Sequence, residues 1–316
     1  MADAYLGLAD LIKINDKNNA ERDISDLLDN APLLRVLPGD TCPETTHKYL
    51  KQTSAPVVGF RAIDAGLENK KSGDEQVTVN LAILDASWVV DQAVPRGCGK
   101  GEAWFMARES ARHLRQAFFV TEKQFIYGTV HGDAGGCTGL ADASTLNHTN
   151  AAMVVDATGS SVGAGSSVWA VRASPDLNGV VAIVGQAGKI TIDAVSSILK
   201  DDATGKHYPA YLTPILGWLC LQIGGAYSVG RLCNLTAESG KTLTDDLIAD
   251  LLSKFKAGEP PTHLAMSRRS LKQLRESRTA TNATGAPAPF PTEAFGVPIV
   301  ASDAVLDTET ILTAGT

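Results

Sequence analysis

The chain has 316 residues, 44% of them apolar and 20% charged, which is typical of a globular protein large enough to bury a core. Its formal net charge of -7 argues against a dedicated nucleic-acid-binding protein, because such proteins usually present a basic surface to phosphate. The five cysteines include no C-x-x-C pair and are odd in number, so they indicate neither a zinc ribbon nor a closed disulfide framework but buried, reduced thiols.

The first 40 residues predict short amphipathic helices joined by polar links, the second of which is expected to stop before Pro32. The segment lacks the basic stretch and apolar run of a secretory signal, so none is expected. Pro38-Gly39 and Pro43 end this arm. The apolar positions of the two helices are Leu6, Leu8, Leu11, Ile12, Ile24, Leu27 and Leu28.

A long β-hairpin is predicted next. VGFRAID, from Val58, leads into the charged tip AGLENKKSGDE, and QVTVNLAIL returns with Val77, Val79, Leu81 and Ile83 on one face. An isolated two-stranded hairpin is marginal in water because it has little neighbouring surface on which to bury its apolar face. We therefore interpret the arm and the hairpin as extensions that pack on another subunit.

The longest predicted helix covers residues 102–127. Glu102 suits the positive end of the helix dipole, and Gly128 ends the helix. Apolar residues three and four positions apart predict its buried face, with Thr121 as the one polar step. These residues are Trp104, Ala107, Ala111, Leu114, Phe118 and Phe125.

The stretch from Pro209 to Gly230 contains no formally charged residue and is long enough to raise the possibility of a membrane span. Its prolines and glycines oppose a continuous helix, however. Apolar residues occupy both alternating faces, which predicts a strand covered by protein on both sides. Gly224-Gly225 marks either a bulge or a turn within it.

The remaining elements alternate between strands and helices. SSVWAVRA and GVVAIVG predict strands, and a helix follows Thr242, its expected N-cap, before Gly258 and Pro260-Pro261 end it. THLAMSRRSLKQLRESR predicts a strand that enters a basic helix, and FGVPIVASD and ETILTAGT predict closing strands.

No motif indicates catalysis, a metal or a cofactor. Gly240-Lys241-Thr242 lacks the first glycine of a phosphate-binding loop, because Leu235 stands there. His131 and Asp133, in a glycine-rich loop, could form an acid-base pair but fit an ordinary polar turn better. The basic residues of 268–278 predict a solvated helix face with ion pairs, with contact to nucleic acid as the alternative.

Several stretches, taken in order, resemble the major capsid proteins of tailed double-stranded DNA phages. They cover most of the chain from about Ile24 onward. They are VTVNLAILDASWVVDQAV, a long helix ending in FIYGT, CTGLAD, SSVWAVRA, GWLCLQIGGAYSVGRLCNL, PTHLAMSRRSLKQL and FGVPIVASDAVLDTE.

The resemblance implies an α+β fold of the Hong Kong 97 type. Residues 1–45 would form an N-terminal arm and 46–90 an extended loop. Residues 91–175, with the spine helix at 102–127 and joined by strands in 205–236, would form a peripheral domain. Residues 176–204 and 237–316 would form an axial domain.

The resemblance also implies a function. Pentamers and hexamers would close into an icosahedral head around double-stranded DNA, which the subunits would contact non-specifically. A portal, a scaffolding protein and a decoration protein would be the other partners, and no membrane is expected. The subunit would assemble in the bacterial host's cytoplasm and reside in the virion. The alternatives are an encapsulin-like compartment shell and a cytosolic α+β enzyme with an unrecognised site.

The hairpin supplies the expected contacts between subunits. Its apolar face would gain burial on a neighbour, and its charged tip would set the register by charge complementarity. The candidate residues are Glu68, Lys70, Lys71, Asp74, Glu75, Val77, Val79, Leu81 and Ile83.

Overall fold

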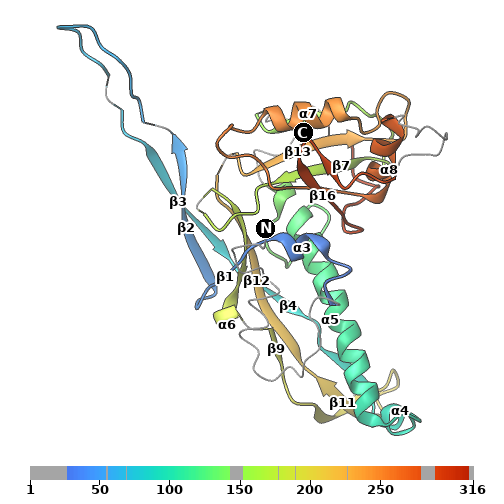
Figure 1. Cartoon of the computed structure of the whole chain (residues 1–316). Helices are drawn as coiled ribbons and strands as arrows, with labels where there is room; N and C mark the ends of the chain where they lie inside the picture. Colours follow the sequence, from blue (N-terminus) through green and yellow to red (C-terminus); the bar gives the residue numbers. More distant parts are fainter. Residues whose placement is uncertain are drawn as a thin grey trace.

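The computed structural model describes residues 27–54, 56–68, 70–142, 152–176, 178–188, 190–225, 227–278 and 289–312. It contains two large sheets, a long helix beside one of them and a hairpin that projects away from the body (Figure 1). A mixed α+β architecture was predicted and is observed.

The part of the N-terminal arm that is described folds onto its own subunit. Helix α3 (Pro32–Val36) begins at Pro32, a residue suited to the first helical position because its missing N–H needs no partner there. Leu28, Leu33 and Leu34 are fully buried. As predicted, a helix stops before Pro32: Leu27 is helical and a turn at 28–30 separates it from α3. The expectation that this part of the arm packs on another subunit is wrong, because its leucines are buried in their own subunit. The first predicted helix, around Leu6 to Ile12, and the start of the second, at Ile24, lie outside the described residues.

The uncharged stretch forms strands, as predicted, and both of its faces are buried. Strand β12 (Ile215–Ile223) lies at the centre of a five-stranded sheet of order β1-β8-β12-β4, in which β9 also pairs with β12. Cys220 and Leu221, on opposite faces, are both buried. Protein therefore covers this stretch, and no helix among the described residues is long and apolar enough to cross a membrane. The other strands of the sheet are β1 (Gly39–Thr41), β4 (Ala82–Asp85), β8 (Val180–Val184) and β9 (Ile190–Ile192).

A turn, and not a bulge, follows β12 at Gly224-Gly225. The Ser228 N–H donates to the Gly225 carbonyl oxygen at 3.3 Å, and strand β13 (Val229–Leu235) then enters a different sheet. That second sheet has six strands in the order β15-β16-β14-β7-β13-β6. The two glycines thus join the two sheets of the molecule. The strands are β6 (Val154–Asp156), β7 (Ser166–Val171), β14 (His263–Met266), β15 (Glu293–Ala294) and β16 (Val297–Ala301).

Two helices pack with the second sheet (Figure 1). Helix α7 (Asp245–Ser253) is capped by Thr244, whose hydroxyl accepts from the Leu247 N–H, so the predicted cap at Thr242 is wrong by two residues. Helix α8 (Arg268–Ser277) follows β14 as predicted and is capped by Ser267. The described part of ETILTAGT forms a single β-bridge, Gly165 to Glu309, and no strand.

The long helix α5 (Glu102–Tyr127) has the bounds predicted from sequence. It spans about 39 Å at 1.5 Å per residue and runs along β4 and β12 (Figure 1). Its second half is buried on nearly every side, with Phe118 and Phe125 in the core. Its first half is only partly covered, and Trp104, which was expected to be buried, is exposed.

Gly128 ends α5 in a conformation that excludes a side chain. Its φ of 54° lies in the left-handed region, and a Cβ atom there would lie 1.6 Å from Asp142 Oδ2 and 2.5 Å from Gly139 N. Helix η1 (Leu140–Asp142) places that carboxylate. Close packing and backbone strain therefore both require glycine.

Replacing Gly128 with Ala is expected to lower the free energy of unfolding by about 2 kcal/mol or more, measured by urea denaturation. Gly258→Ala is the matched control, because a Cβ at Gly258 meets no atom within 4 Å. A Gly128 variant as stable as the Gly258 variant would show that the turn is not fixed as described.

Candidate subunit interfaces

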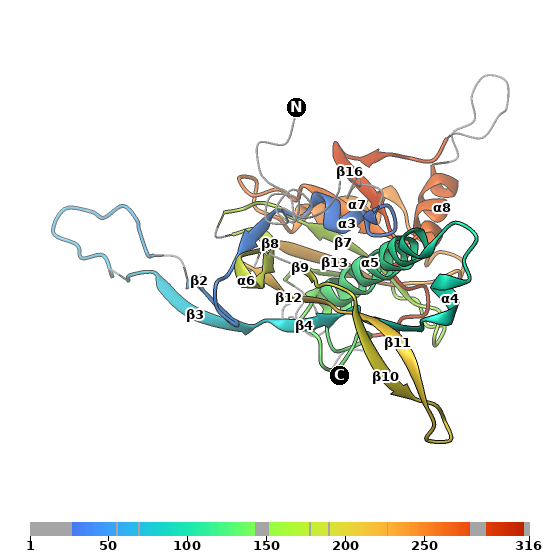
Figure 2. The ribbon, with the colours of Figure 1, turned by 90° about the horizontal axis from the view of Figure 1, so that it is seen from below.

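The projecting hairpin consists of β2 (Thr46–Ser54) and β3 (Gly73–Asn80). They pair with each other from Thr46–Asn80 to Ser54–Gly73, and within the described residues neither pairs with a third strand. The first strand is therefore residues 46–54 and not the predicted 58–64. Figures 1 and 2 both show the hairpin extending well beyond the rest of the subunit.

Hydrogen bonds attach the base of the hairpin to the five-stranded sheet. His47 Nε2 lies 2.7 Å from Gln222 Oε1, and the Tyr49 hydroxyl donates to the Ile223 carbonyl oxygen at 3.0 Å. Burial raises the pKa of the Tyr49 hydroxyl above its usual value, although the Ile223 hydrogen bond opposes this. These contacts fix the direction in which the hairpin leaves the body.

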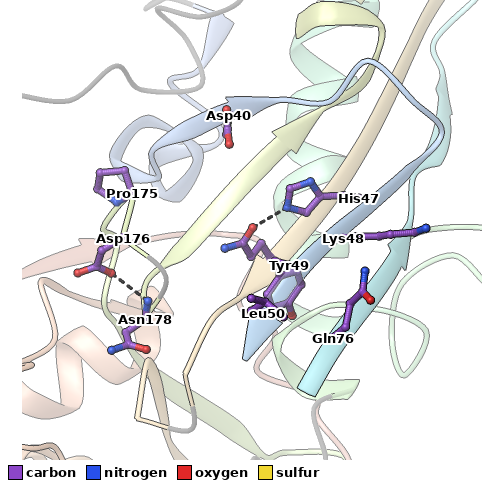
Figure 3. Close-up of a pocket in the computed structure, with 10 residues that line it drawn as sticks. Asp40, His47, Lys48, Tyr49, Leu50, Gln76, Pro175, Asp176 and Asn178 are labelled. Atoms are coloured by element: carbon purple, nitrogen blue, oxygen red, sulfur yellow. Dashed lines mark hydrogen bonds between the residues drawn. The ribbon is translucent and has the colours of Figure 1, made fainter. Parts of the chain in front are cut away.

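An open groove of about 790 Å³ lies beside this base (Figure 3). Strand β2 lines one side with His47, Tyr49 and Leu50, and the loop that contains Asp176 and Asn178 lines the other. Its lining mixes aliphatic, aromatic, amide and charged groups and holds no nucleophile beside a base. The groove therefore lies between β2 of the hairpin and the loop of the body that contains Asp176 and Asn178.

The loop at the tip of the hairpin is apolar on the side that follows β2. Residues 58–64, expected to form a strand, instead belong to the loop between β2 and β3. The exposed fractions of the Val58, Phe60 and Ile63 side chains are 85%, 107% and 92%. The expectation of a purely hydrophilic tip is therefore wrong. The apolar residues of 58–64 were visible in the sequence. A β-strand and an exposed binding loop can both carry such a pattern, however, so it did not distinguish between them.

The predicted contact residues divide into four groups by burial and charge. Val77 and Val79 are partly buried on β3, as a face that points toward the body would be. Leu81 is buried inside its own subunit, where its Cδ2 would lie 2.6 Å from a Cβ placed on Gly185 of α6 (Gly185–Gly188). Ile83 is 57% exposed. The charged candidates are all exposed and form no ion pair within the described residues; they are Glu68, Lys70, Lys71, Asp74 and Glu75.

The prediction that Leu81 lies on the same contact face as Val77 and Val79 is wrong, because the chain passes from one sheet to another there. Strand β3 ends at Asn80 and β4 begins at Ala82, which pairs with Leu219 of β12. On β4 the inward residues are Ala82 and Leu84, so Ile83 faces outward. Leu81 therefore cannot contact a neighbour, whereas Ile83 can.

A second projection was not anticipated as one unit. Strands β10 (Ser196–Asp201) and β11 (His207–Thr213) form a hairpin that also pairs with β5 (Trp88–Asp91), and Figure 2 shows it extending from the body. The expected domain boundary between residues 204 and 205 falls in its turn and would separate two paired strands. Exposed Leu199 is a further candidate contact residue on this hairpin.

The residues considered for chemistry have structural partners. The His131 ring packs edge-on against Tyr127, and the Asp133 N–H donates to Gln124 Oε1, so the pair belongs to a polar turn. Burial raises the pKa of the Cys137 thiol to about 12, which keeps it protonated. Four of the five cysteines are buried. Among the described residues, no group of three or more His, Cys, Asp or Glu could hold a metal ion.

Four of the five basic residues of 268–278 form ion pairs, as predicted; the fifth, Arg275, instead lies over the Phe290 ring. Arg268 pairs with Asp303, Arg269 with Asp307 at 3.3 Å, and Arg278 with Asp245 at 2.7 Å. Lys272 pairs with Glu276 on the helix itself. The alternative interpretation of this face as a nucleic-acid contact loses its main support.

The model of one family, described as major capsid protein GP7, matches residues 16–313 of this chain. The chain belongs to that family. The capsid protein is thus a structural shell subunit, as the sequence resemblance indicated, and the match favours this assignment over a compartment shell or an enzyme. None of the curated proteins matches the sequence.

Solved structures confirm the fold of the capsid protein. The near-atomic structure of bacteriophage Epsilon15 is 18% identical with a TM-score of 0.63, and the match covers 99% of both chains. The bacteriophage JBD30 capsid is 11% identical with a TM-score of 0.51, over 92% of this chain and 97% of that one. The fold is accordingly α+β of the Hong Kong 97 type.

A buried carboxylate on α5 attaches the arm to the body of the capsid protein. Glu122 is fully buried and accepts from the Leu33 and Leu34 N–H groups of α3 at 2.8 and 3.1 Å, and from the Ser302 hydroxyl. Burial raises its pKa from 4.5 to about 7, although these hydrogen bonds oppose the rise. Sequence analysis missed Glu122, whose partners lie 88, 89 and 180 positions away.

A buried ion pair joins the C-terminal segment to the six-stranded sheet. Arg231 of β13 and Glu309 lie 2.9 Å apart and are both almost fully buried. The hydroxyls of Tyr127 and Ser167 each donate to Glu309 at 2.5 Å, and the Arg231 guanidinium lies 4.7 Å from the centre of the Trp169 ring. Each charge thus has several partners, which compensates for its removal from water.

Proposed function

We propose that the capsid protein forms pentamers and hexamers of an icosahedral phage head around double-stranded DNA, and that each hairpin packs across a neighbouring subunit. The observation that supports this most directly is the projecting hairpin, which pairs with no third strand among the described residues and carries three exposed apolar side chains at its tip. Exposed apolar residues gathered on one projection are typical of a protein contact. Glu68, Lys70, Lys71, Asp74 and Glu75 then set the register by charge complementarity.

The remaining parts of the proposal follow from the role of a head subunit. A portal and a scaffolding protein are its expected partners, a decoration protein is a further one, and packaged DNA is its contents. Assembly takes place in the bacterial cytoplasm, and the product is the virion head. The subunit carries out no reaction of its own. The arm 1–45, the extended loop 46–90 and the peripheral and axial domains remain the proposed division, except that residues 196–213 stay together.

Replacing Phe60 and Ile63 with Ser is expected to prevent shell formation without unfolding the subunit. Burial of one such side chain contributes about 1.5–3 kcal/mol, so the double variant should need at least about a 100-fold higher concentration to assemble. Both side chains are exposed in the subunit, so its unfolding midpoint should change no more than it does for an ordinary surface substitution. Negative-stain electron microscopy and sedimentation velocity measure the shells.

Ala62→Ser is the control, because it alters the same loop without removing a large apolar group. Normal shells from the Phe60/Ile63 variant, at wild-type concentration and stability, would contradict the role assigned to the tip. The particle contents separate the alternatives: genome-length DNA supports a phage head, whereas enzyme cargo supports an encapsulin-like compartment. A stable monomer with turnover would indicate an enzyme.

A further inference from the structure

The first half of α5 carries a row of cations on its exposed face. Trp104, Arg108, Arg112 and Arg115 are spaced four, four and three residues apart, which places them on one side of a helix. All four are exposed, and so is Lys100, just before the helix. We call these five residues the basic face of α5.

Most of these cations lack a carboxylate partner. Arg112 pairs with Glu109 at 2.5 Å, but neither Arg108, Arg115 nor Lys100 forms an ion pair in the parts of the chain that the structure describes. Helix α8 differs, because carboxylates pair with Arg268, Arg269 and Lys272, three of its four cations. In a chain with a net charge of -7, the basic face of α5 is therefore a local positive surface that remains available to an anion.

Trp104 holds two of the cations in place. Lys100 Nζ lies 4.7 Å and the Arg108 guanidinium carbon 5.2 Å from the centre of its ring. The indole thus restricts these side chains while leaving their N–H donors exposed. A surface tryptophan between two unpaired cations has no evident role in the core of the subunit, whose sheets α5 contacts on its other side.

The geometry fits a line of phosphates. Residues 108 to 115 rise about 10 Å along the helix, and the helical part of the basic face, from 104 to 115, extends over roughly 16 Å. Duplex DNA presents one phosphate per about 3.4 Å of each strand, and Arg donates readily to such oxygens. The hairpin tip of another subunit would fit the basic face less well than DNA does, because its acidic residues Glu68, Asp74 and Glu75 are interspersed with Lys70 and Lys71.

We propose that the basic face of α5 contacts the phosphate backbone of double-stranded DNA without regard to sequence. The inference rests on the proposed function, since the shell must enclose DNA, and it identifies the residues that touch the contents. The face lies on a rigid helix remote in sequence from both projecting hairpins. Binding through a few cations per subunit is weak for one copy but is repeated over the whole shell, which suits DNA that is later released.

The test compares Arg108→Gln/Arg115→Gln with the control Arg268→Gln/Lys272→Gln on α8. A labelled random-sequence 20-base-pair duplex is titrated with the unassembled subunit, and fluorescence anisotropy is read at several salt concentrations. The α5 variant should bind at least about tenfold more weakly, and its plot of log K against log salt should be shallower by about 2, because two phosphate contacts are lost. The α8 variant should bind within about threefold of wild type.

Unchanged affinity and salt slope in the α5 variant, or an equal loss in the α8 variant, would overturn the inference. Shell formation by each variant is followed separately by electron microscopy, and the α5 variant is expected to assemble. Loss of assembly without loss of DNA binding would show that this face contacts a second copy and would also overturn it. Failure of the wild-type chain to form shells under any condition would instead count against the proposed function.

Discussion

Replacing Glu309 with Ala is expected to lower the free energy of unfolding by about 3–5 kcal/mol, because it leaves the Arg231 charge buried without a counter-ion. The Ser167 and Tyr127 hydroxyls lose their acceptor at the same time. Since small domains are stable by only about 5–15 kcal/mol, this is a large fraction of the total. Urea denaturation of the unassembled subunit measures it.

Asp303→Ala is the matched control, because it breaks an ion pair with Arg268 that is exposed on both sides. Its cost should stay below about 1 kcal/mol. The double variant Arg231→Met/Glu309→Gln removes both charges but keeps an acceptor for the hydroxyls, and should recover most of the loss. Equal losses in the Glu309 and Asp303 variants would show that the buried pair does not hold the C-terminal segment.

The stability of the wild-type subunit should fall between about pH 4.5 and pH 7 through Glu122. Its pKa is raised from 4.5 to about 7 in the folded chain, so over this range the folded state binds a proton that the unfolded state lacks. A rise in pH then favours the unfolded state, by about 3 kcal/mol across the whole window. The stabilisation is complete below pH 4.5 and is lost as pH rises through 7.

Glu122→Gln should remove this component, because an amide does not titrate but still accepts from the Leu33 and Leu34 N–H groups. Urea denaturation at pH 4.5, 6 and 8 should give a flatter profile than wild type. Glu276→Gln, which removes an exposed carboxylate, serves as the control and should run parallel to wild type. Parallel profiles for wild type and the Glu122 variant would rule out this role.

The hairpin shows where sequence patterns were ambiguous. Residues 58–64 and 46–54 both lie before the returning strand, and the apolar alternation of 58–64 favoured the wrong one. The true strand, THKYLKQTS, is polar because most of its length projects into solvent. Alternating apolar residues indicate which side chains are to be buried. They do not indicate whether the burying surface belongs to the same subunit or to a neighbouring one.

The sequence by itself determined the bounds of α5, the strand character of the uncharged stretch and of β7 and β8, and the resemblance that led to the family. These depend on local periodicity and on capping residues close by in the chain. Only the tertiary structure decided which sheet each strand joins, that α3 docks through Glu122, and that Leu81 is buried while Phe60 is exposed. It also decided that most cations of α8 pair with carboxylates, whereas within the described residues Arg108 and Arg115 of α5 do not. Each of these depends on partners far apart in sequence, and no local pattern encodes such contacts.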